Sequence, residues 1–155
     1  MIKVLIADDE VNVCKLISNL VDWQEMGMTV VGVAHNGIEA LELIKTLQPD
    51  IVVTHIRMPG YDGIELIRRA KEINKSIDFI IVSGYKHFDY AHNAIQYNVE
   101  NYLLKPLKKN EFVQTLTRMA QRYRQRDQQQ SEAERLEAQL KSDMKKLRNG
   151  FMIDL

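Results

Sequence analysis

The sequence predicts an α/β domain in which five parallel strands alternate with helices around one doubly wound sheet. Two observations predict this class. Short, almost continuously apolar runs recur along the first two thirds of the chain, which is typical of strands covered on both faces. Segments with apolar side chains at helical spacing separate these runs. Because crossovers are right-handed, few topologies remain, and the simplest has the strand order 2-1-3-4-5.

Five short runs are the expected strands. They consist mostly of β-branched, aliphatic or aromatic residues, a composition that favours extended structure. They span residues 3–7, 29–34, 51–54, 79–82 and 102–104.

Four helices are expected between these strands. Asn36 and Asp62 can cap the second and third helices, because their side-chain oxygens accept hydrogen bonds from free backbone N–H groups. Pro49 helps to end the second helix. The residues expected on the inner faces are Val13, Leu16, Ile17 and Leu20 in the first helix, Ala40, Leu41, Ile44 and Leu47 in the second, Ile64, Ile67 and Ala70 in the third, and Ala91, Ala94 and Ile95 in the fourth.

From Lys109 the chain becomes rich in Gln, Glu, Arg, Lys, Ala and Leu, with neither proline nor glycine before Gly150. This composition predicts one long helix over about residues 109–149, whose first turns pack on the sheet. One heptad register fits Leu116, Met119, Tyr123, Ala133, Leu140, Met144, Leu147 and Phe151, but it also places Arg126, Gln130 and Glu137 on the same seam.

The expected organisation is therefore a compact domain over residues 1–120 and a helical linker or coiled-coil segment over residues 121–155. We expect the linker to pair with that of a second copy, giving a homodimer. The polar middle of the seam leaves two alternatives open, a helix that folds back on its own domain and a helix that frays in solution.

Composition excludes several classes of protein. Lysine plus arginine equals aspartate plus glutamate, 21 against 21, so no net field attracts nucleic acid or a membrane surface. The single cysteine, Cys14, cannot form an internal disulfide. The sequence has no apolar run of the roughly 18–20 residues that span a bilayer and no signal-peptide pattern at its start. We expect a cytoplasmic protein without membrane contact.

Polar side chains follow the expected strands at the ends where this fold binds ligands. Asp8 and Asp9 follow the first strand, and adjacent carboxylates repel unless a cation or base compensates them. Their oxygens suit Mg²⁺. Ser83 and Lys105 follow the fourth and fifth strands, where a hydroxyl and an ammonium would suit a phosphoryl group. Pro106 permits a cis peptide after Lys105. Taken singly, each of these residues is also explained as part of a solvated loop.

Four segments together resemble the signature of the receiver domain of two-component response regulators. They are Asp8-Asp9-Glu10, the stretch PDIVVTHIRMPGYDG at 49–63, Ser83-Gly84-Tyr85 and YLLKP at 102–106. The resemblance covers roughly residues 1–120 in continuous order. Asp22-Trp23 and the run SGYKHF at 83–88 further resemble the YesN-like subfamily, in which a helical linker and an AraC-type helix-turn-helix domain follow the receiver.

The resemblance implies a flavodoxin-like fold and assigns roles by position. Asp8, Asp9 and the backbone carbonyl of Arg57 would hold Mg²⁺. Ser83 would supply the switch hydroxyl, and Lys105 would contact the phosphate. In the family, the phosphate comes from a sensor histidine kinase.

Tyr102 matches the aromatic residue that turns inward when the switch hydroxyl moves to the phosphate. A surface aromatic at a strand end is the alternative for this residue. DNA would be contacted only through a helix-turn-helix domain beyond residue 155.

His55 departs from the family pattern, which has aspartate at this position. Imidazole cannot form an acyl phosphate and is no hard anionic ligand, so phosphorylation should fail and Mg²⁺ binding should weaken. We expect His55 to form a hydrogen-bonded ion pair with Asp8 or Asp9 and to hold the domain in one state. The alternatives are phosphorylation of the imidazole nitrogen, Zn²⁺ or another transition metal bound by His55, Asp8 and Asp9, and an inert substitution.

The expected function is thus the signal-input domain of a response regulator that controls transcription through an attached AraC-type domain, without phosphorylation at position 55. A stand-alone interaction or dimerisation module that works without phosphorylation is the alternative. We expect no enzymatic activity.

Overall fold

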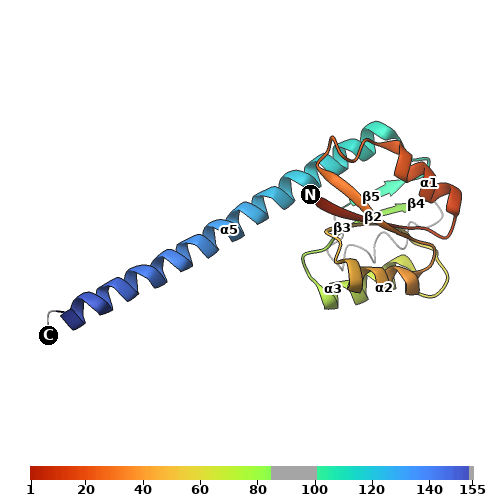
Figure 1. Cartoon of the computed structure of the whole chain (residues 1–155). Coiled ribbons are helices and arrows are strands. Elements are labelled where there is room, and N and C mark those ends of the chain that lie inside the picture. Colours follow the sequence, from red (N-terminus) through yellow and green to blue (C-terminus); the bar gives the residue numbers. More distant parts are fainter. Residues whose placement is uncertain (85–100, 154–155) are drawn as a thin grey trace. The chain divides into compact units, whose positions relative to one another are not determined.

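A computed structural model of the chain describes residues 1–84 and 101–153, with side chains through residue 147. Its five strands form one parallel sheet in the order β2-β1-β3-β4-β5, which confirms the predicted topology (Figure 1). Each strand extends its predicted run by one residue at one or both ends. The strands are β1 (Ile2–Ala7), β2 (Met28–Ala34), β3 (Ile51–His55), β4 (Asp78–Ser83) and β5 (Asn101–Leu104).

The described helices are α1 (Val11–Leu20), α2 (Gly37–Leu47), α3 (Gly63–Ile73) and α5 (Lys109–Ile153). The helix predicted around residues 91–95 lies outside the described residues.

Both predicted helix caps are confirmed. The side chain of Asn36 accepts a hydrogen bond from the backbone N–H of Glu39 at 2.7 Å, and Asp62 accepts one from Glu65 at 2.8 Å. Gln48 adopts a left-handed backbone (φ 50°) directly before Pro49, so α2 ends where the sequence predicted.

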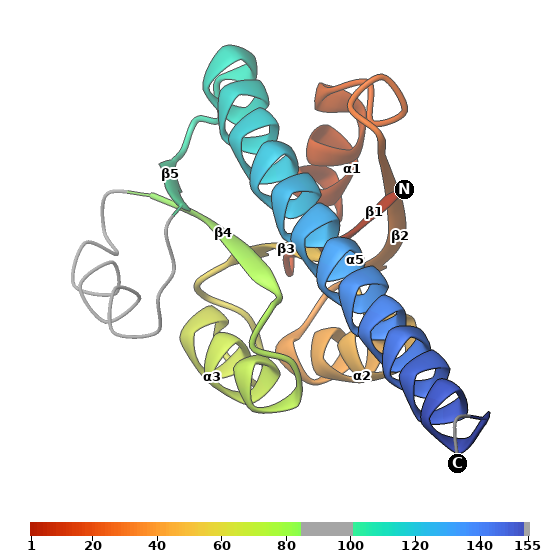
Figure 2. The same cartoon turned by 90° about the vertical axis from the view of Figure 1, so that its left-hand side faces the viewer.

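Helices cover both faces of the sheet. Helices α2 and α3 lie on one face, and α1 lies on the other together with the first turns of α5 (Figure 2). The α2 and α3 side holds a cluster of buried side chains from β1, β3, β4 and both helices, which includes Leu5, Val52, Ile81, Ile44 and Leu66. This core fixes the strand ends, and therefore the side chains that follow them, in one arrangement.

The inner face predicted for α1 is partly wrong. Leu16 is 54% exposed, whereas Cys14 and Ile17 are the buried residues of this helix. The difference arises because the thiol of Cys14 faces the sheet, 3.4 Å from the carbonyl oxygen of Asp8. The predicted inner face missed Cys14 because cysteine was not counted among the apolar residues, although a buried cysteine packs as a small apolar side chain.

Trp23 connects the segment after α1 with the start of α5. Its indole N–H donates to the carbonyl of Ser18 at 2.9 Å, and its ring meets the fully buried ring of Phe112 edge-on, with centroids 6.0 Å apart. Such edge contacts between aromatic rings stabilise beyond the area they bury. The contact anchors the first turns of α5 on the segment that follows α1.

The chain divides into two units, Met1–Arg118 and Met119–Leu155. The second unit is helical as far as Ile153, so the predicted long helix is confirmed and runs four residues beyond its predicted end. The residues that this unit leaves exposed include four large apolar side chains, each more than 60% exposed: Leu136, Leu140, Met144 and Leu147. Within the described part of the chain, no helix combines the length and apolarity needed to cross a membrane.

Candidate functional site

The carboxyl ends of three parallel strands bring a carboxylate, an imidazole and an ammonium together. Asp8 follows β1 and is 1% exposed, His55 ends β3 and has a 12% exposed side chain, and Lys105 follows β5. Gly63 lets α3 begin close behind β3, because a Cβ atom there would lie 2.5 Å from the carbonyl oxygen of His55. The fold thus gathers the residues that the sequence predicted for this edge.

The negative charge of the buried Asp8 carboxylate is only partly compensated by its neighbours. One oxygen accepts a hydrogen bond from the backbone N–H of Glu10 at 2.9 Å, and the other lies 3.8 Å from the ammonium of Lys105. Burial raises the pKa of Asp8 although the Glu10 bond, His55 and Lys105 all act to lower it. The pocket therefore favours further positive charge next to this carboxylate.

His55 directs its Nδ1 atom at a backbone carbonyl. Nδ1 lies 3.1 Å from the carbonyl oxygen of Arg57 and 3.7 Å from a carboxylate oxygen of Asp9. A carbonyl oxygen can only accept, so Nδ1 is the donor in this arrangement. A hydrogen-bonded ion pair with Asp8 or Asp9 was expected; Nδ1 approaches Asp9 to 3.7 Å, which is too long for a hydrogen bond, and the Arg57 carbonyl is the acceptor instead.

Three side chains at this edge form a group that could hold a metal ion. One ligand atom from each of Asp8, Asp9 and His55 lies within 4.8 Å of the other two, and no other group of this kind occurs in the described residues. Mg²⁺ prefers a near-octahedral shell of oxygen atoms. Because the third side chain of the group offers an imidazole nitrogen in place of an oxygen, the donor set fits Mg²⁺ poorly.

Ser83 and Lys105 lie side by side at the ends of β4 and β5. The backbone N–H of Lys105 donates to the carbonyl of Ser83 at 2.8 Å, and the peptide between Lys105 and Pro106 is cis, as expected. Ser83 is fully buried, and its hydroxyl donates to the carbonyl of Gly84 at 3.3 Å. Its predicted role towards a phosphate, like that of Lys105, stays a prediction.

Tyr102 on β5 is half-buried and packs against the core cluster on the α2 and α3 side of the sheet. The alternative that Tyr102 is merely a surface aromatic at a strand end is therefore not supported. Its role as a switch residue stays a prediction. The motif residues 85–88 lie outside the described residues.

Two residues of this edge were missed by sequence reasoning. His35 follows β2, and its Nδ1 lies 3.3 Å from the carbonyl oxygen of Asp8 and 3.8 Å from the thiol of Cys14. Burial and, next, the charge of Asp8 raise the pKa of Cys14 to about 11, so its thiol stays protonated at neutral pH. The position of His35 directly after a strand, like that of Asp8, is the signal that could have revealed it.

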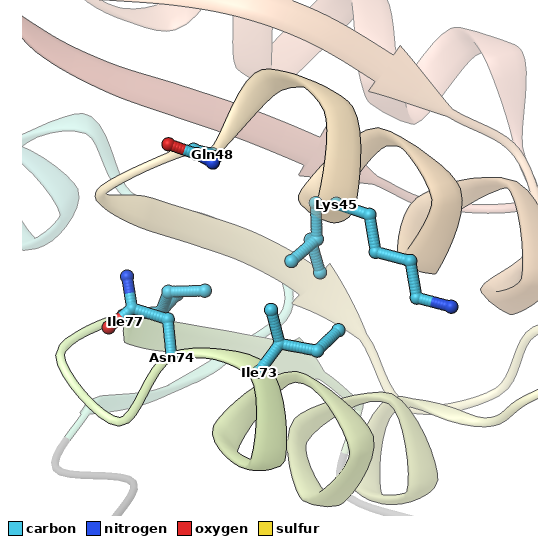
Figure 3. A pocket seen from close by; sticks show the side chains of 6 residues that line it. Lys45, Gln48, Ile73, Asn74 and Ile77 are labelled. Atoms are coloured by element: carbon cyan, nitrogen blue, oxygen red, sulfur yellow. The ribbon is translucent and has the colours of Figure 1, made fainter.

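A cavity of about 220 Å³ lies elsewhere, between the C-terminal ends of α2 and α3 (Figure 3). It opens at the edge of the sheet opposite to the strand ends described above. Its lining is mixed, with apolar Ile73 and Ile77 beside polar Lys45, Gln48 and Asn74.

Comparisons with known proteins agree in pointing to one family. The family model of the response regulator receiver domain matches residues 4–117. The transcriptional regulatory protein YesN of Bacillus subtilis (strain 168) is 38% identical over 127 residues, which are 82% of this chain and 34% of that protein.

Two solved structures are similar over nearly their whole length. The receiver domain of the response regulator AraT from Geobacillus stearothermophilus is 36% identical with a TM-score of 0.78, and the similarity covers 81% of this chain and 97% of that one. A two component transcriptional regulator AraC from Clostridium phytofermentans ISDg is 26% identical with a TM-score of 0.74, covering 83% and 99%. The chain spans between 34% and 49% of the curated relatives first matched.

Proposed function

The chain belongs to the response regulator receiver domain family, and on this premise we propose that it is the signal-input domain of a transcription regulator that does not accept a phosphoryl group. It is a receiver domain related to YesN-type and AraC-type regulators. The proposal concerns how its pocket works and what it controls.

The observation that carries the proposal is the placement of His55. Its ring occupies the end of β3, beside Asp8 and Asp9, where the family resemblance places the acceptor aspartate. Its Nδ1 donates to Arg57 and so is not free as a nucleophile in this arrangement. A carboxylate oxygen, which an acyl phosphate requires, is missing at this position.

The remaining pocket residues then have structural tasks. Lys105 compensates part of the charge of buried Asp8, and the hydroxyl of Ser83 stays bound to its own main chain. We infer that the domain rests in one state whatever a sensor histidine kinase supplies, and that it performs no catalysis of its own. Mg²⁺, which receiver domains typically bind, would be held only weakly by Asp8, Asp9 and the carbonyl of Arg57.

The output is proposed from the relatives. YesN and the AraC-like protein are transcription regulators by name, and the similarity covers only 34% of YesN. An AraC-type helix-turn-helix domain attached beyond residue 155 would therefore contact DNA, and the linker helix would join two copies. The cytoplasm is where such a regulator would work.

Phosphorylation in the test tube checks the central claim. The chain and the variant His55→Asp are incubated with acetyl phosphate and Mg²⁺, and their intact masses are measured. We expect no adduct on the chain and one phosphoryl group on the variant, because only the variant has a carboxylate at position 55, where the family resemblance places the acceptor.

The variant His55→Asn is the matched control, since it has the shape of aspartate without the nucleophile. It should remain unmodified. A stoichiometric adduct on the unchanged chain would overturn the proposal, and a fragment spectrum that places it on His55 would show a phosphorylated imidazole instead.

A further inference from the structure

We propose that Asp8, Asp9 and His55 form a binding site for a transition-metal dication of the Zn²⁺ type, with the backbone carbonyl of Arg57 as a fourth donor. The inference goes beyond the proposed signalling function and stands or falls separately from it. It assigns to His55 the task of a ligand and changes the class of ion that the pocket selects.

The spacing of the donor atoms supports a small ion bound by all of them. Ligands about 2.0–2.2 Å from a tetrahedral zinc ion lie roughly 3.3 Å from one another. In the structure, Nδ1 of His55 is 3.1 Å from the carbonyl oxygen of Arg57 and 3.7 Å from Asp9, and the three side-chain ligands lie within 4.8 Å of one another.

The Arg57 carbonyl is the independent observation beyond the side-chain cluster. It belongs to the main chain between β3 and α3, and Gly63 holds that segment close to the end of β3. A donor fixed in this way costs little to organise when the ion arrives. Metal binding at Nδ1 would move the imidazole proton to Nε2, which leaves the Arg57 oxygen free to face the ion.

The chemistry of the donors decides the kind of ion. A set of one imidazole, two carboxylates and a carbonyl suits Zn²⁺ or Co²⁺, whereas Mg²⁺ demands oxygen atoms and retains its water. Charge points the same way, because among the described residues the buried carboxylate of Asp8 has one ammonium nearby, that of Lys105 at 3.8 Å. A dication would compensate the buried carboxylate of Asp8 fully.

Calorimetric titration of the whole chain with Zn²⁺, after removal of metal by a chelator, tests the site. We expect one equivalent to bind, with Mg²⁺ binding more weakly. The variants His55→Ala and Asp9→Asn should each weaken Zn²⁺ binding at least about tenfold, since even the loss of an outer partner of a ligand has effects of this size. Asp9 is exposed, so its variant should fold normally.

The matched control is His35→Ala, which removes an imidazole from the same edge of the sheet. It should change Zn²⁺ affinity by less than about twofold, because Nδ1 of His35 faces the Asp8 carbonyl and Cys14 rather than the carboxylates. Long-range ¹H–¹⁵N spectra of the histidine rings add a direct readout, with the Nδ1 resonance of His55 expected to shift on addition of Zn²⁺.

Three results would overturn the inference: no binding of Zn²⁺, equal affinity of the chain and His55→Ala, or a loss on His35→Ala as large as that on His55→Ala. The last would place the ion between His35 and Cys14. None of these results would contradict the proposed function, because the phosphorylation experiment that tests it uses Mg²⁺ alone.

Discussion

At the scale of single residues, we propose that one side chain, His55, separates the fold of this pocket from the chemistry of its family. His55 lies at the end of β3, a buried strand that pairs with β1 on one side and β4 on the other. The carboxylates, the lysine and the buried serine remain in place around it. The electrostatics of the pocket change nevertheless, because an imidazole carries no negative charge, whereas a carboxylate at this position would.

Asp8→Asn should stabilise the metal-free protein. Burial holds the pKa of Asp8 above its usual 3.8, so the folded state binds this proton more tightly than the unfolded chain. The ionised carboxylate therefore destabilises the fold at neutral pH, and this effect fades as the pH falls through the raised pKa towards 3.8. An amide keeps the oxygen that accepts from Glu10 without the charge.

We expect urea unfolding in the presence of a chelator to show a higher midpoint for the variant at neutral pH and a smaller difference near about pH 4. Asp9→Asn, at an exposed carboxylate, should shift the midpoint little. A lower midpoint for Asp8→Asn would mean that the contact with Lys105 outweighs burial.

At the scale of elements, local hydrogen bonds decide where helices begin and which charges they carry. The caps of α2 and α3 use the same geometry, an Asn or Asp oxygen bound to the backbone N–H three residues later. Helix α1 has no side-chain cap, and Asp8 instead binds the backbone N–H of Glu10 just before it. The start of α1 is thus tied to the pocket.

Asn36→Ala should lower the free energy of unfolding by about 1 kcal/mol, because it leaves the backbone N–H of Glu39 without its side-chain acceptor. Urea unfolding measures this change. Asn12→Ala, on the exposed side of α1, is the control and should stay within about 0.5 kcal/mol of the parent. Equal stability of the Asn36 variant would show that the cap contributes nothing.

Glu65 in α3 should make stability sensitive to acid. Hydrogen bonds from Arg68 and Arg69 lower its pKa from 4.5 to about 2, so the unfolded chain takes up this proton first. The contribution is present above pH 4.5 and is lost as the pH falls towards about 2. Unfolding measured across this range should show Glu65→Gln less stable than the parent at neutral pH and equal to it near the acid end.

The exposed Glu42 on α2 offers the control for this experiment. Glu42→Gln should follow the parent over the whole range. A constant difference between Glu65→Gln and the parent at every pH would contradict the role assigned to the ion pairs with Arg68 and Arg69.

At the scale of the whole molecule, the two units differ in how they bury apolar side chains. The first has a two-sided core, whereas the second is a helix with four large apolar side chains more than 60% exposed. Leu140, Met144 and Leu147 lie three or four residues apart, so they share one side of the helix. In the proposed function, these side chains pack against the same helix of a second copy of the chain.

Sedimentation should therefore show residues 1–155 as a dimer and residues 1–120 as a monomer. The double variant Leu140→Glu and Leu147→Glu should shift the long form to monomer, because it would place charges in the apolar contact. Ser142→Glu, on the opposite side of the same turn, is the matched control and should leave the dimer intact. Equal monomeric masses for the long and the short form would remove the proposed pairing.

Much of the fold followed from local features of the sequence. The apolar runs predicted all five strands and their order, Asn36 and Asp62 predicted where two helices begin, and the composition after Lys109 predicted one long helix. These features could be predicted because they depend on residues close together in the chain. The residues gathered at the strand ends, Asp8 and Lys105 among them, followed from the parallel topology alone.

Only the tertiary structure decided which atoms meet inside the pocket. It directed Nδ1 of His55 to the carbonyl of Arg57 rather than to a carboxylate, and it placed Cys14 and His35 beside Asp8. These contacts join residues from different strands and loops, at distances set by strand register and by the close approach of α3 at Gly63. Sequence determined that an imidazole stands at position 55, where the family resemblance places a carboxylate, and the packing at the carboxyl ends of the strands determined which donors surround it.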